Sequence, residues 1–296
     1  MECVAILSPG AMGHAVGAHL RDRGLRVVSD LQGRSALTRE RAARSGIEDP
    51  GGLDAVVSIS DLVLAILPPS SAEALATRVA GAIERTGARP VYADCNAIAP
   101  ATSRRLAAIL EAAGSEFVDA GLIGAPPGRG VATRLYASGA RAAALSGLSR
   151  GADDEGLRVH LLGDVIGRAS ALKMSYAALT KGTMTLHAAV LVAAHQLDVF
   201  DELASELESS QPQAWARMGI LPFLPADAER WVGEMEEIAI TFRDAGLVDD
   251  FHRGAAAIFR LMAATPYAAE TRESVDRERT LEETIRMLGA HLTPRD

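Results

Sequence analysis

The sequence predicts an α/β protein, with a doubly wound, mainly parallel sheet in its N-terminal part and an all-helical C-terminal part. Short apolar runs alternate with amphipathic segments as far as about residue 165, which is the pattern of βαβ units. A glycine-rich turn joins the first apolar run to the first amphipathic segment. Beyond residue 166 the apolar residues keep helical spacing and no strand pattern returns. We therefore expect one domain over residues 1–165 and a second over residues 166–296.

The individual elements follow from the same periodicity. Apolar runs predict strands at residues 2–7, 26–29, 62–67, 91–94, 116–119, 134–138 and 159–162. Helical spacing predicts helices at residues 13–23, 35–45, 71–86, 102–114 and 140–148, and then at 167–207, 228–245, 251–264 and 275–291. The long helix that begins near residue 167 would connect the two domains.

Composition and charge exclude several classes of function. The 296 residues are 48% apolar and 23% charged, which is typical of a globular protein. A net charge of −8 does not suit nucleic-acid binding, which needs concentrated positive charge. Cys3 and Cys95 are the only cysteines, and no Cys/His cluster indicates a metal site. Without a basic leader or about 18 continuous apolar residues, we expect a cytoplasmic protein that binds no membrane.

The glycine-rich turn, ILSPGAMGHAVG, follows the first predicted strand and opens the first predicted helix. It keeps the second and third glycines of a G-x-G-x-x-G dinucleotide fingerprint, Gly10 and Gly13, while Ser8 replaces the first. Gly10 would let the backbone approach a pyrophosphate, and Gly13 would let the helix pack on the strand. We expect Ser8, Gly10, Ala11, Met12 and Gly13 to bind the dinucleotide. The alternative is a glycine-rich turn without a ligand.

The end of the second predicted strand bears on the choice of dinucleotide. An NAD site usually has Asp or Glu about 20 residues after the glycines, but here Gly33, Arg34 and Ser35 occupy that region. A guanidinium and hydroxyls suit the 2′-phosphate of NADP, which a carboxylate would repel. We therefore expect NADP, bound in part by Gly33, Arg34 and Ser35. In the alternative, Asp30 binds the ribose of NAD and Arg34 is a solvated loop residue.

One face of the long predicted helix carries unusual chemistry. Lys173, Tyr176, Ala177, Thr180 and Lys181 follow the spacing i, i+3, i+4, i+7 and i+8, which places them on one face. Buried lysines are rare, and desolvation or a second ammonium lowers a lysine pKa toward the range useful in acid–base catalysis. We expect Lys173 to be the general acid/base, and Tyr176 and Lys181 to contact substrate. In the alternative, only Lys173 lies in the cleft and Lys181 is solvated.

A later predicted helix also has two faces of different character. Trp231, Met235 and Ile238 belong to an apolar stripe, and Glu234 and Glu237 belong to a charged face. The pattern leaves two interpretations open: a core stripe with a salt-bridged face, or a helix that lines the substrate cleft.

These motifs together resemble the β-hydroxyacid dehydrogenases, relatives of phosphogluconate dehydrogenase and of the imine reductases. Met12 matches the Met of the family's G-x-G-x-M-G motif, and Leu67-Pro68 matches a strand end that covers the adenosine. Asn96, in the stretch from Asp94 to Pro100, matches a polar position near the nicotinamide. The stretches KMSYAALTKG and WVGEMEEIA are similar to a phosphogluconate dehydrogenase-like subgroup.

The resemblance also implies a substrate loop and a catalytic helix. Residues 119–127 are similar to the family's substrate loop, and a glycine-rich turn at 163–167 precedes Lys173, which matches the catalytic lysine. Ala125 replaces the loop's second glycine, and Ala177 replaces an Asn that normally holds the substrate. The resemblance implies that the following residues bind substrate: Asn96, Gly121, Leu122, Ile123 and Gly124. It implies that Leu67, Pro68 and Asn96 also contact the cofactor.

From these observations we expect an NADP-dependent oxidoreductase. It would transfer hydride between the nicotinamide and a small β-hydroxy acid or its keto form, with Lys173 as general acid/base. The resemblance implies a homodimer formed through the helical domain. Two alternatives remain: an imine (C=N) reductase of the same superfamily, whose members often replace the lysine, and a non-catalytic NADP-binding module.

Overall fold

The computed structural model describes residues 1–292 and divides into two compact units, Met1–Met174 and Ser175–Asp296. The boundary lies later in the chain than the expected one at residue 165. It falls inside a single long helix, α6 (Arg168–Gln196), so the first two turns of this helix belong to the first unit.

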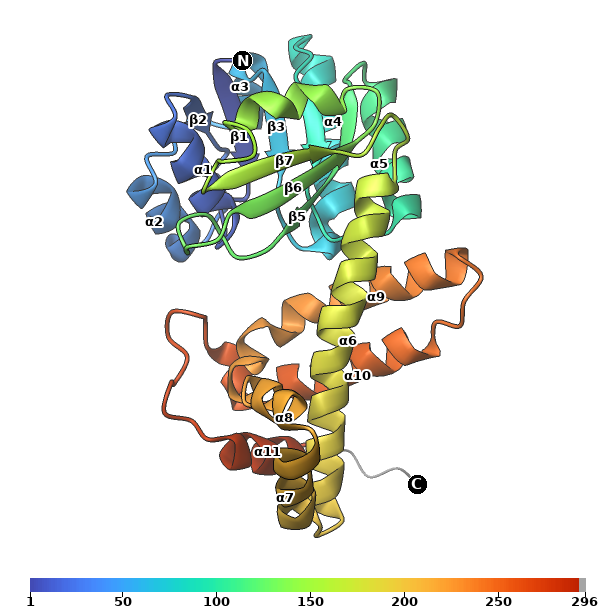
Figure 1. The fold of residues 1–296 in the computed structure, drawn as a ribbon. Helices are drawn as coiled ribbons and strands as arrows, with labels where there is room; N and C mark the ends of the chain where they lie inside the picture. The colour runs from blue at the N-terminus through green and yellow to red at the C-terminus, as the bar shows by residue number, and fades with distance from the viewer. Residues whose placement is uncertain (293–296) are drawn as a thin grey trace. The chain divides into compact units, whose positions relative to one another are not determined.

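The first unit is built on a seven-stranded sheet with the order β2-β1-β3-β4-β5-β6-β7 (Figure 1). The strands are β1 (Cys3–Leu7), β2 (Arg26–Val28), β3 (Leu62–Ala65), β4 (Val91–Asp94), β5 (Phe117–Ile123), β6 (Thr133–Ser138) and β7 (Leu157–Leu161). All neighbouring pairs are parallel except β5 and β6, which are antiparallel. Each strand overlaps a predicted one, and the doubly wound, mainly parallel sheet is confirmed.

Helices cover both faces of this sheet, so its strands are apolar on both sides. Ile6 packs in a core cluster with Leu20 of α1, whereas the next residue, Leu7, packs in a second cluster with Val79 of α4 and Leu106 of α5. The helices are α1 (Gly13–Asp22), α2 (Ala36–Arg44), α3 (Leu53–Ile59), α4 (Ala72–Thr86) and α5 (Pro100–Ala112), with 3-10 turns at η1 (Pro69–Ser71) and η2 (Ala142–Leu148).

The first unit differs from the prediction in three details. The helix expected at 140–148 is the 3-10 segment η2, and the short helix α3 was not predicted. The strand expected at 116–119 continues to Ile123, because its second half pairs with β6. A segment expected to be a loop therefore belongs to the sheet.

The second unit is helical, and residues 175–292 contain no strand. After α6 come α7 (Phe200–Ser210), α8 (Pro212–Met218), η3 (Leu221–Phe223), α9 (Pro225–Asp244), α10 (Asp250–Ala263), η4 (Pro266–Ala269) and α11 (Leu281–Ala290). Helices α9 and α10 pack together, and the ring centroids of Trp231 and Phe259 lie 5.2 Å apart between them.

Helix boundaries in this unit differ from the prediction, and helix α8 was not predicted. The helix expected at 167–207 is two helices, because Asp198 adopts a φ of +57° and interrupts the regular backbone after Gln196. The last helix begins at Leu281 rather than near residue 275. Thr280 and Glu283 form a capping box there, which satisfies amide groups that the first turn leaves unpaired.

Helix α6 is long and apolar enough, by length and composition alone, to cross a membrane. Its most apolar window has a mean hydropathy of 1.3, and 44% of that window is buried inside the protein. The core helix of a helical domain passes the same test, so this property does not identify a membrane segment.

Candidate active site in the N-terminal unit

The glycine-rich turn leads from β1 into α1 through a left-handed residue. Ser8 has a φ of +71°, and its carbonyl oxygen accepts a hydrogen bond of 2.7 Å from the amide of Gly10. A left-handed backbone favours glycine, so Ser8 carries strain at the position where the fingerprint normally has Gly. A Cβ on Gly13 would lie 2.9 Å from the Ser8 oxygen and 3.1 Å from Ile6 Cγ2. Gly13 is therefore required for α1 to pack on β1.

The same turn presents amide groups that could hold a pyrophosphate. A Cβ on Gly10 would meet no atom nearer than 4.0 Å, so the space beside this residue is open. Within residues 1–292, the amides of Ala11, Met12 and Gly13 donate no hydrogen bond. Amide groups pointing outward at the start of a helix favour phosphate binding, and these residues fit the diphosphate of a dinucleotide.

The loop after β2 brings three charged residues together. Asp30 is buried, and its carboxylate accepts a hydrogen bond of 3.1 Å from the amide of Gln32 and pairs with Arg78 at 3.2 Å. Arg34 lies beside them, and burial lowers the pKa of its guanidinium. The nearby Asp30 carboxylate opposes this pKa shift and Arg78 adds to it. Asp30 is thus already engaged by protein groups at the end of β2.

The other predicted residues of this loop shape the backbone. Gly33 has a φ of +69°, which suits glycine. Ser35 caps α2, because its hydroxyl accepts from the Thr38 amide at 3.2 Å and donates to the Thr38 hydroxyl at 3.1 Å. Ser35 therefore stabilises the helix that follows Arg34.

The ends of β3 and β4 are joined through Asn96. Its Oδ1 accepts a hydrogen bond of 2.6 Å from the amide of Leu67, and its Nδ2 donates to Asp94 at 2.9 Å. Its own amide also donates to Asp94, at 3.0 Å. Pro68 follows Leu67 and precedes the 3-10 turn η1. Asn96, at 3% exposure, connects two strand ends, and only one hydrogen of its Nδ2 group remains for another partner.

The predicted substrate segment is mostly strand rather than loop. Gly121, Leu122 and Ile123 are the last residues of β5, and Gly124 follows with a φ of +115°. The error has a physical reason, because the antiparallel partner β6 extends β5 beyond the point where a parallel strand would end. The backbone of Gly121, Leu122 and Ile123 is therefore paired with β6.

Helix α6 rests on the end of β5 at Lys173. A Cβ on Gly121 would lie only 3.0 Å from Lys173 Cβ and 3.4 Å from the Ala169 oxygen, so glycine permits this close packing. Lys173 Nζ donates a hydrogen bond to the carbonyl oxygen of Leu122. The structure thus brings Lys173 and the segment from Gly121 to Gly124 together within one unit.

The start of α6 is held by Asp119, whose role the sequence analysis missed. This fully buried carboxylate accepts hydrogen bonds from the amides of Gly167 at 2.9 Å and Ser170 at 3.1 Å, and from the hydroxyl of Ser170. It also accepts from Ser103 Oγ at 3.0 Å and Ser138 Oγ at 2.8 Å. A carboxylate is stabilised near the first turn of a helix, so Asp119 fixes α6 on the sheet. An Asp inside an apolar strand was the available signal.

The remaining predicted site residues lie in the second unit. Tyr176 is 45% exposed, and Ala177 is buried. Lys181 is not solvated, because its Nζ lies 2.6 Å from a carboxylate oxygen of Glu234 and 5.6 Å from the ring centroid of Trp231. The face of α9 that carries Glu234 is therefore salt-bridged, as one of the two interpretations expected.

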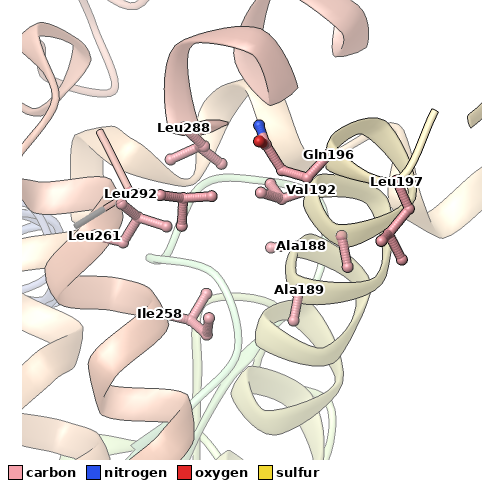
Figure 2. A pocket seen from close by; sticks show the side chains of 10 residues that line it. Ala188, Ala189, Val192, Gln196, Leu197, Ile258, Leu261, Leu288 and Leu292 are labelled. Atoms are coloured by element: carbon pink, nitrogen blue, oxygen red, sulfur yellow. The ribbon is translucent and has the colours of Figure 1, made fainter. Parts of the chain in front are cut away.

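An apolar cavity of about 380 Å³ also lies in the second unit (Figure 2). It is lined from α6, α10 and α11 by residues such as Val192, Ile258, Leu261 and Leu288, and Gln196 is the one polar residue in its lining. No group of three or more His, Cys, Asp or Glu within residues 1–292 could hold a metal ion.

Comparisons with known proteins agree with this architecture. Residues 4–148 match the family described as the NAD binding domain of 6-phosphogluconate dehydrogenase, and residues 194–262 match a domain of unknown function, DUF1932. The 3-hydroxyisobutyrate dehydrogenase of Pseudomonas aeruginosa is 30% identical over 146 residues, which are 47% of this chain and 46% of that relative.

Solved structures are similar in fold over most of the chain. A conserved protein of unknown function with structural similarity to 3-hydroxyacid dehydrogenases is 29% identical, with a TM-score of 0.61 over 88% of this chain and 96% of that one. Mycobacterium tuberculosis 3-hydroxyisobutyrate dehydrogenase has a TM-score of 0.66 at 18% identity, over 97% of this chain and 99% of that one.

Two reductases also share the fold. An Aspergillus terreus reductive aminase in complex with NADPH and a Streptomyces aurantiacus imine reductase each have a TM-score of 0.52, at 19% and 20% identity, over 97% of this chain and 99% of theirs. The family match supports a nicotinamide-dependent oxidoreductase. The N-terminal unit therefore contains an NAD binding domain of the 6-phosphogluconate dehydrogenase type, and the chain is similar over most of its length to a protein that resembles the 3-hydroxyacid dehydrogenases in structure.

Proposed function

We propose that this protein is an NADP-dependent oxidoreductase that transfers hydride between the nicotinamide and a small β-hydroxy acid or its keto form. The observation that carries the proposal is the position of Lys173. Its ammonium contacts the Leu122 carbonyl at the end of β5, in the same compact unit as the phosphate-binding turn. A lysine held by the sheet in a dinucleotide-binding unit has the chemistry of a general acid/base.

The protein's own groups would handle the proton. The nicotinamide, when bound, supplies or accepts the hydride. In the reductive direction the ammonium of Lys173 donates a proton to the carbonyl oxygen of the substrate, and in the oxidative direction its neutral amine takes the hydroxyl proton. The Leu122 carbonyl orients Nζ, and Asp119 keeps the helix of Lys173 in register with β5. The Nδ2 group of Asn96 has one hydrogen left to donate to a ligand.

The preference for NADP over NAD rests on the loop after β2. Asp30 already accepts from Gln32 and pairs with Arg78, which leaves it poorly suited to accept hydrogen bonds from a ribose. Arg34 provides a guanidinium that suits a 2′-phosphate. Replacing Arg34 by Gln should weaken NADP binding by about 10- to 100-fold and leave NAD binding nearly unchanged. Turnover of the wild-type enzyme with NAD alone would contradict this preference.

A substrate screen tests the reaction itself. Small β-hydroxy acids and aldonates are offered with NADP and with NAD, and NADPH or NADH absorbance is followed. Lys173→Met should lower kcat by about 10²- to 10⁴-fold on any accepted acid, while NADPH binding measured by fluorescence stays at the wild-type level. Lys173→Met with undiminished kcat would refute the acid–base role. Tight NADPH binding without turnover of any compound would instead indicate a non-catalytic NADP-binding module.

Reduction of C=N bonds is the second candidate reaction, because the chain shares its fold with an imine reductase and a reductive aminase. A panel of cyclic imines, offered with NADPH beside the keto acids, separates the two reactions. Lys173 favours the hydroxy acid reaction, since imine-reducing relatives often replace this lysine. Faster turnover of imines than of keto acids would reverse the order of the two candidates.

We also propose that the protein is a homodimer formed through its helical unit. One face of α6 carries Tyr176, Leu179 and Leu186, which are 45%, 72% and 52% exposed. Their spacing of three and seven residues follows a heptad pattern, which is typical of helices that pack on another helix. A second copy of this face is a fitting partner. Leu179→Glu with Leu186→Glu should halve the mass measured by light scattering, and a wild-type monomer would refute the proposal.

The cysteines support the cytoplasm as the proposed location. Cys3 and Cys95 are buried and form no disulfide with each other. Burial raises the pKa of both thiols, which keeps them protonated and unreactive. Reduced thiols suit a reducing compartment.

A further inference from the structure

Arg134, on strand β6, has a guanidinium for which the described residues, 1–292, provide no hydrogen-bond or ion-pair partner. Its side chain is partly buried, and its Nε atom is buried without a hydrogen bond. No carboxylate within residues 1–292 forms an ion pair with it. Arg158, the neighbouring residue on β7, differs because its Nε donates to the Asp154 carbonyl at 3.0 Å. Removing a charged group from water is costly unless something compensates it, so the Arg134 guanidinium suits an acidic ligand.

This guanidinium lies next to the segment that the resemblance assigns to substrate. A Cβ on Gly124 would lie 4.0 Å from Arg134 Nη2. In the antiparallel pair of β5 and β6, Ile123 is opposite Arg134 and Gly121 is opposite Tyr136. Residues opposite each other share one face of a sheet, so Arg134 lies on the face where Lys173 packs over Gly121.

The spacing on that face suits a small hydroxy acid. Diagonal neighbours on an antiparallel pair are about 7–8 Å apart, and both Lys173 and Arg134 have long side chains. Lys173 Nζ reaches the carbonyl of Leu122, the residue next to Ile123, and Ile123 is the partner of Arg134. A short molecule could therefore meet the lysine with its hydroxyl and the guanidinium with its acidic group.

The charge of this face supports the same ligand. Where β5, β6 and β7 pair, the carboxylate on this face is Asp119, and its oxygens accept hydrogen bonds from serine hydroxyls and backbone amides. A guanidinium presents parallel N–H groups that match the two oxygens of a carboxylate or phosphate. We infer that Arg134 binds the acidic group of the substrate, a carboxylate or a phosphate, while Lys173 acts at the reacting oxygen. This inference rests on the proposed function.

Calorimetry on the NADPH-loaded protein tests the inference without turnover. The probes are 3-hydroxybutyrate for a carboxylate and glycerol 3-phosphate for a phosphate. Butane-1,3-diol is the neutral analogue of 3-hydroxybutyrate. The wild-type protein should bind one of the two acids and not the diol. Arg134→Met should weaken that binding at least tenfold. Arg134→Lys should bind more tightly than Arg134→Met, because lysine keeps the positive charge but lacks the planar guanidinium with its parallel N–H groups. Arg141→Met is the matched control, since this arginine is 53% exposed and pairs with Glu116.

The outcomes separate this inference from the proposed reaction. The acid that binds identifies the group as carboxylate or phosphate. Equal affinity of wild type and Arg134→Met, or no binding of either acid to the wild type, would overturn the role of Arg134. If the wild type still turns over a hydroxy acid in that case and Lys173→Met does not, the proposed function stands without a role for Arg134. Conversely, Arg134-dependent binding of an acid with no turnover of any hydroxy acid would support the anion site and contradict the proposed reaction. NADPH affinity should be equal in all variants.

Discussion

Replacing Asp119 by Asn should loosen the first turn of α6 while changing the shape of the side chain very little. The carboxylate accepts from the amides of Gly167 and Ser170 and from the hydroxyls of Ser103, Ser138 and Ser170. The hydroxyls can reverse and accept a hydrogen bond from the new amide group. The two backbone amides both donate to Oδ2 and can only donate, so the Asn oxygen must take that position and is now neutral.

The size of the effect follows from these contacts. A hydrogen bond to a charged acceptor contributes about 1.5–3 kcal/mol, and a neutral one about 0.5–1.5 kcal/mol. Loss of charge at the two amide contacts therefore predicts a decrease of about 2 kcal/mol in the free energy of unfolding. Asp119→Ala, which leaves both buried amides unpaired, should cost about 4 kcal/mol. Ser103→Ala removes a single hydroxyl contact and should cost about 1 kcal/mol.

Urea unfolding followed by circular dichroism measures these differences, and scanning calorimetry gives the matching change in Tm. A decrease of 2 kcal/mol in a unit of this size corresponds to about 4–8 °C. Because Lys173 is three residues beyond Ser170, Asp119→Asn should also lower kcat on any accepted substrate, with NADPH affinity unchanged. If Asp119→Asn stays within about 0.5 kcal/mol of wild type while Ser103→Ala shows its expected cost, the charge of Asp119 does not hold the helix.

Three further substitutions test other features of the fold. Lys181→Met should destabilise the helical unit by about 3 kcal/mol, because it leaves Glu234 buried without its nearest cation. Adding Glu234→Leu should restore most of that stability, which a double-mutant cycle measured by urea unfolding can check. Backbone amides lower the pKa of Asp154 to about 2, against the opposing effect of burial. The ionised carboxylate therefore contributes about 2 kcal/mol to the free energy of unfolding above about pH 4, and this contribution is lost as pH falls toward 2. Between about pH 4 and pH 2 the free energy of unfolding of Asp154→Asn should decrease less than that of the wild type. Ser8→Gly should stabilise the protein by about 0.5 kcal/mol in thermal unfolding, because it removes left-handed strain, and a decrease in Tm would contradict this account.

The core of the first unit was predictable because its signals are local. Alternating apolar runs and helices specify a doubly wound sheet, and each of the seven strands appears where the periodicity indicated it. The turn at Ser8, Gly10 and Gly13 is equally local, since backbone conformation and close packing depend on residues adjacent in the chain. Lys173 could be singled out because a lysine is rare in so apolar a helix.

Pairing between distant segments was not predictable in the same way. The continuation of β5 to Ile123 depends on β6, and the break after Gln196 depends on the backbone of one residue, Asp198. Such features are decided by partners or conformations that hydrophobic periodicity does not encode.

By itself, the sequence determined where the strands lie in the chain, the glycine-rich turn after β1 and the lysine in the long helix, because each follows from residue types at short spacing. The tertiary structure alone decided the partners of the buried charges. Asp119 lies 51 residues before Ser170, and Glu234 lies 53 residues after Lys181, yet each carboxylate ends in hydrogen-bonding contact with its distant partner. The reason is physical: a buried charge is stable only beside groups that compensate it, and the fold selects those groups from anywhere in the chain.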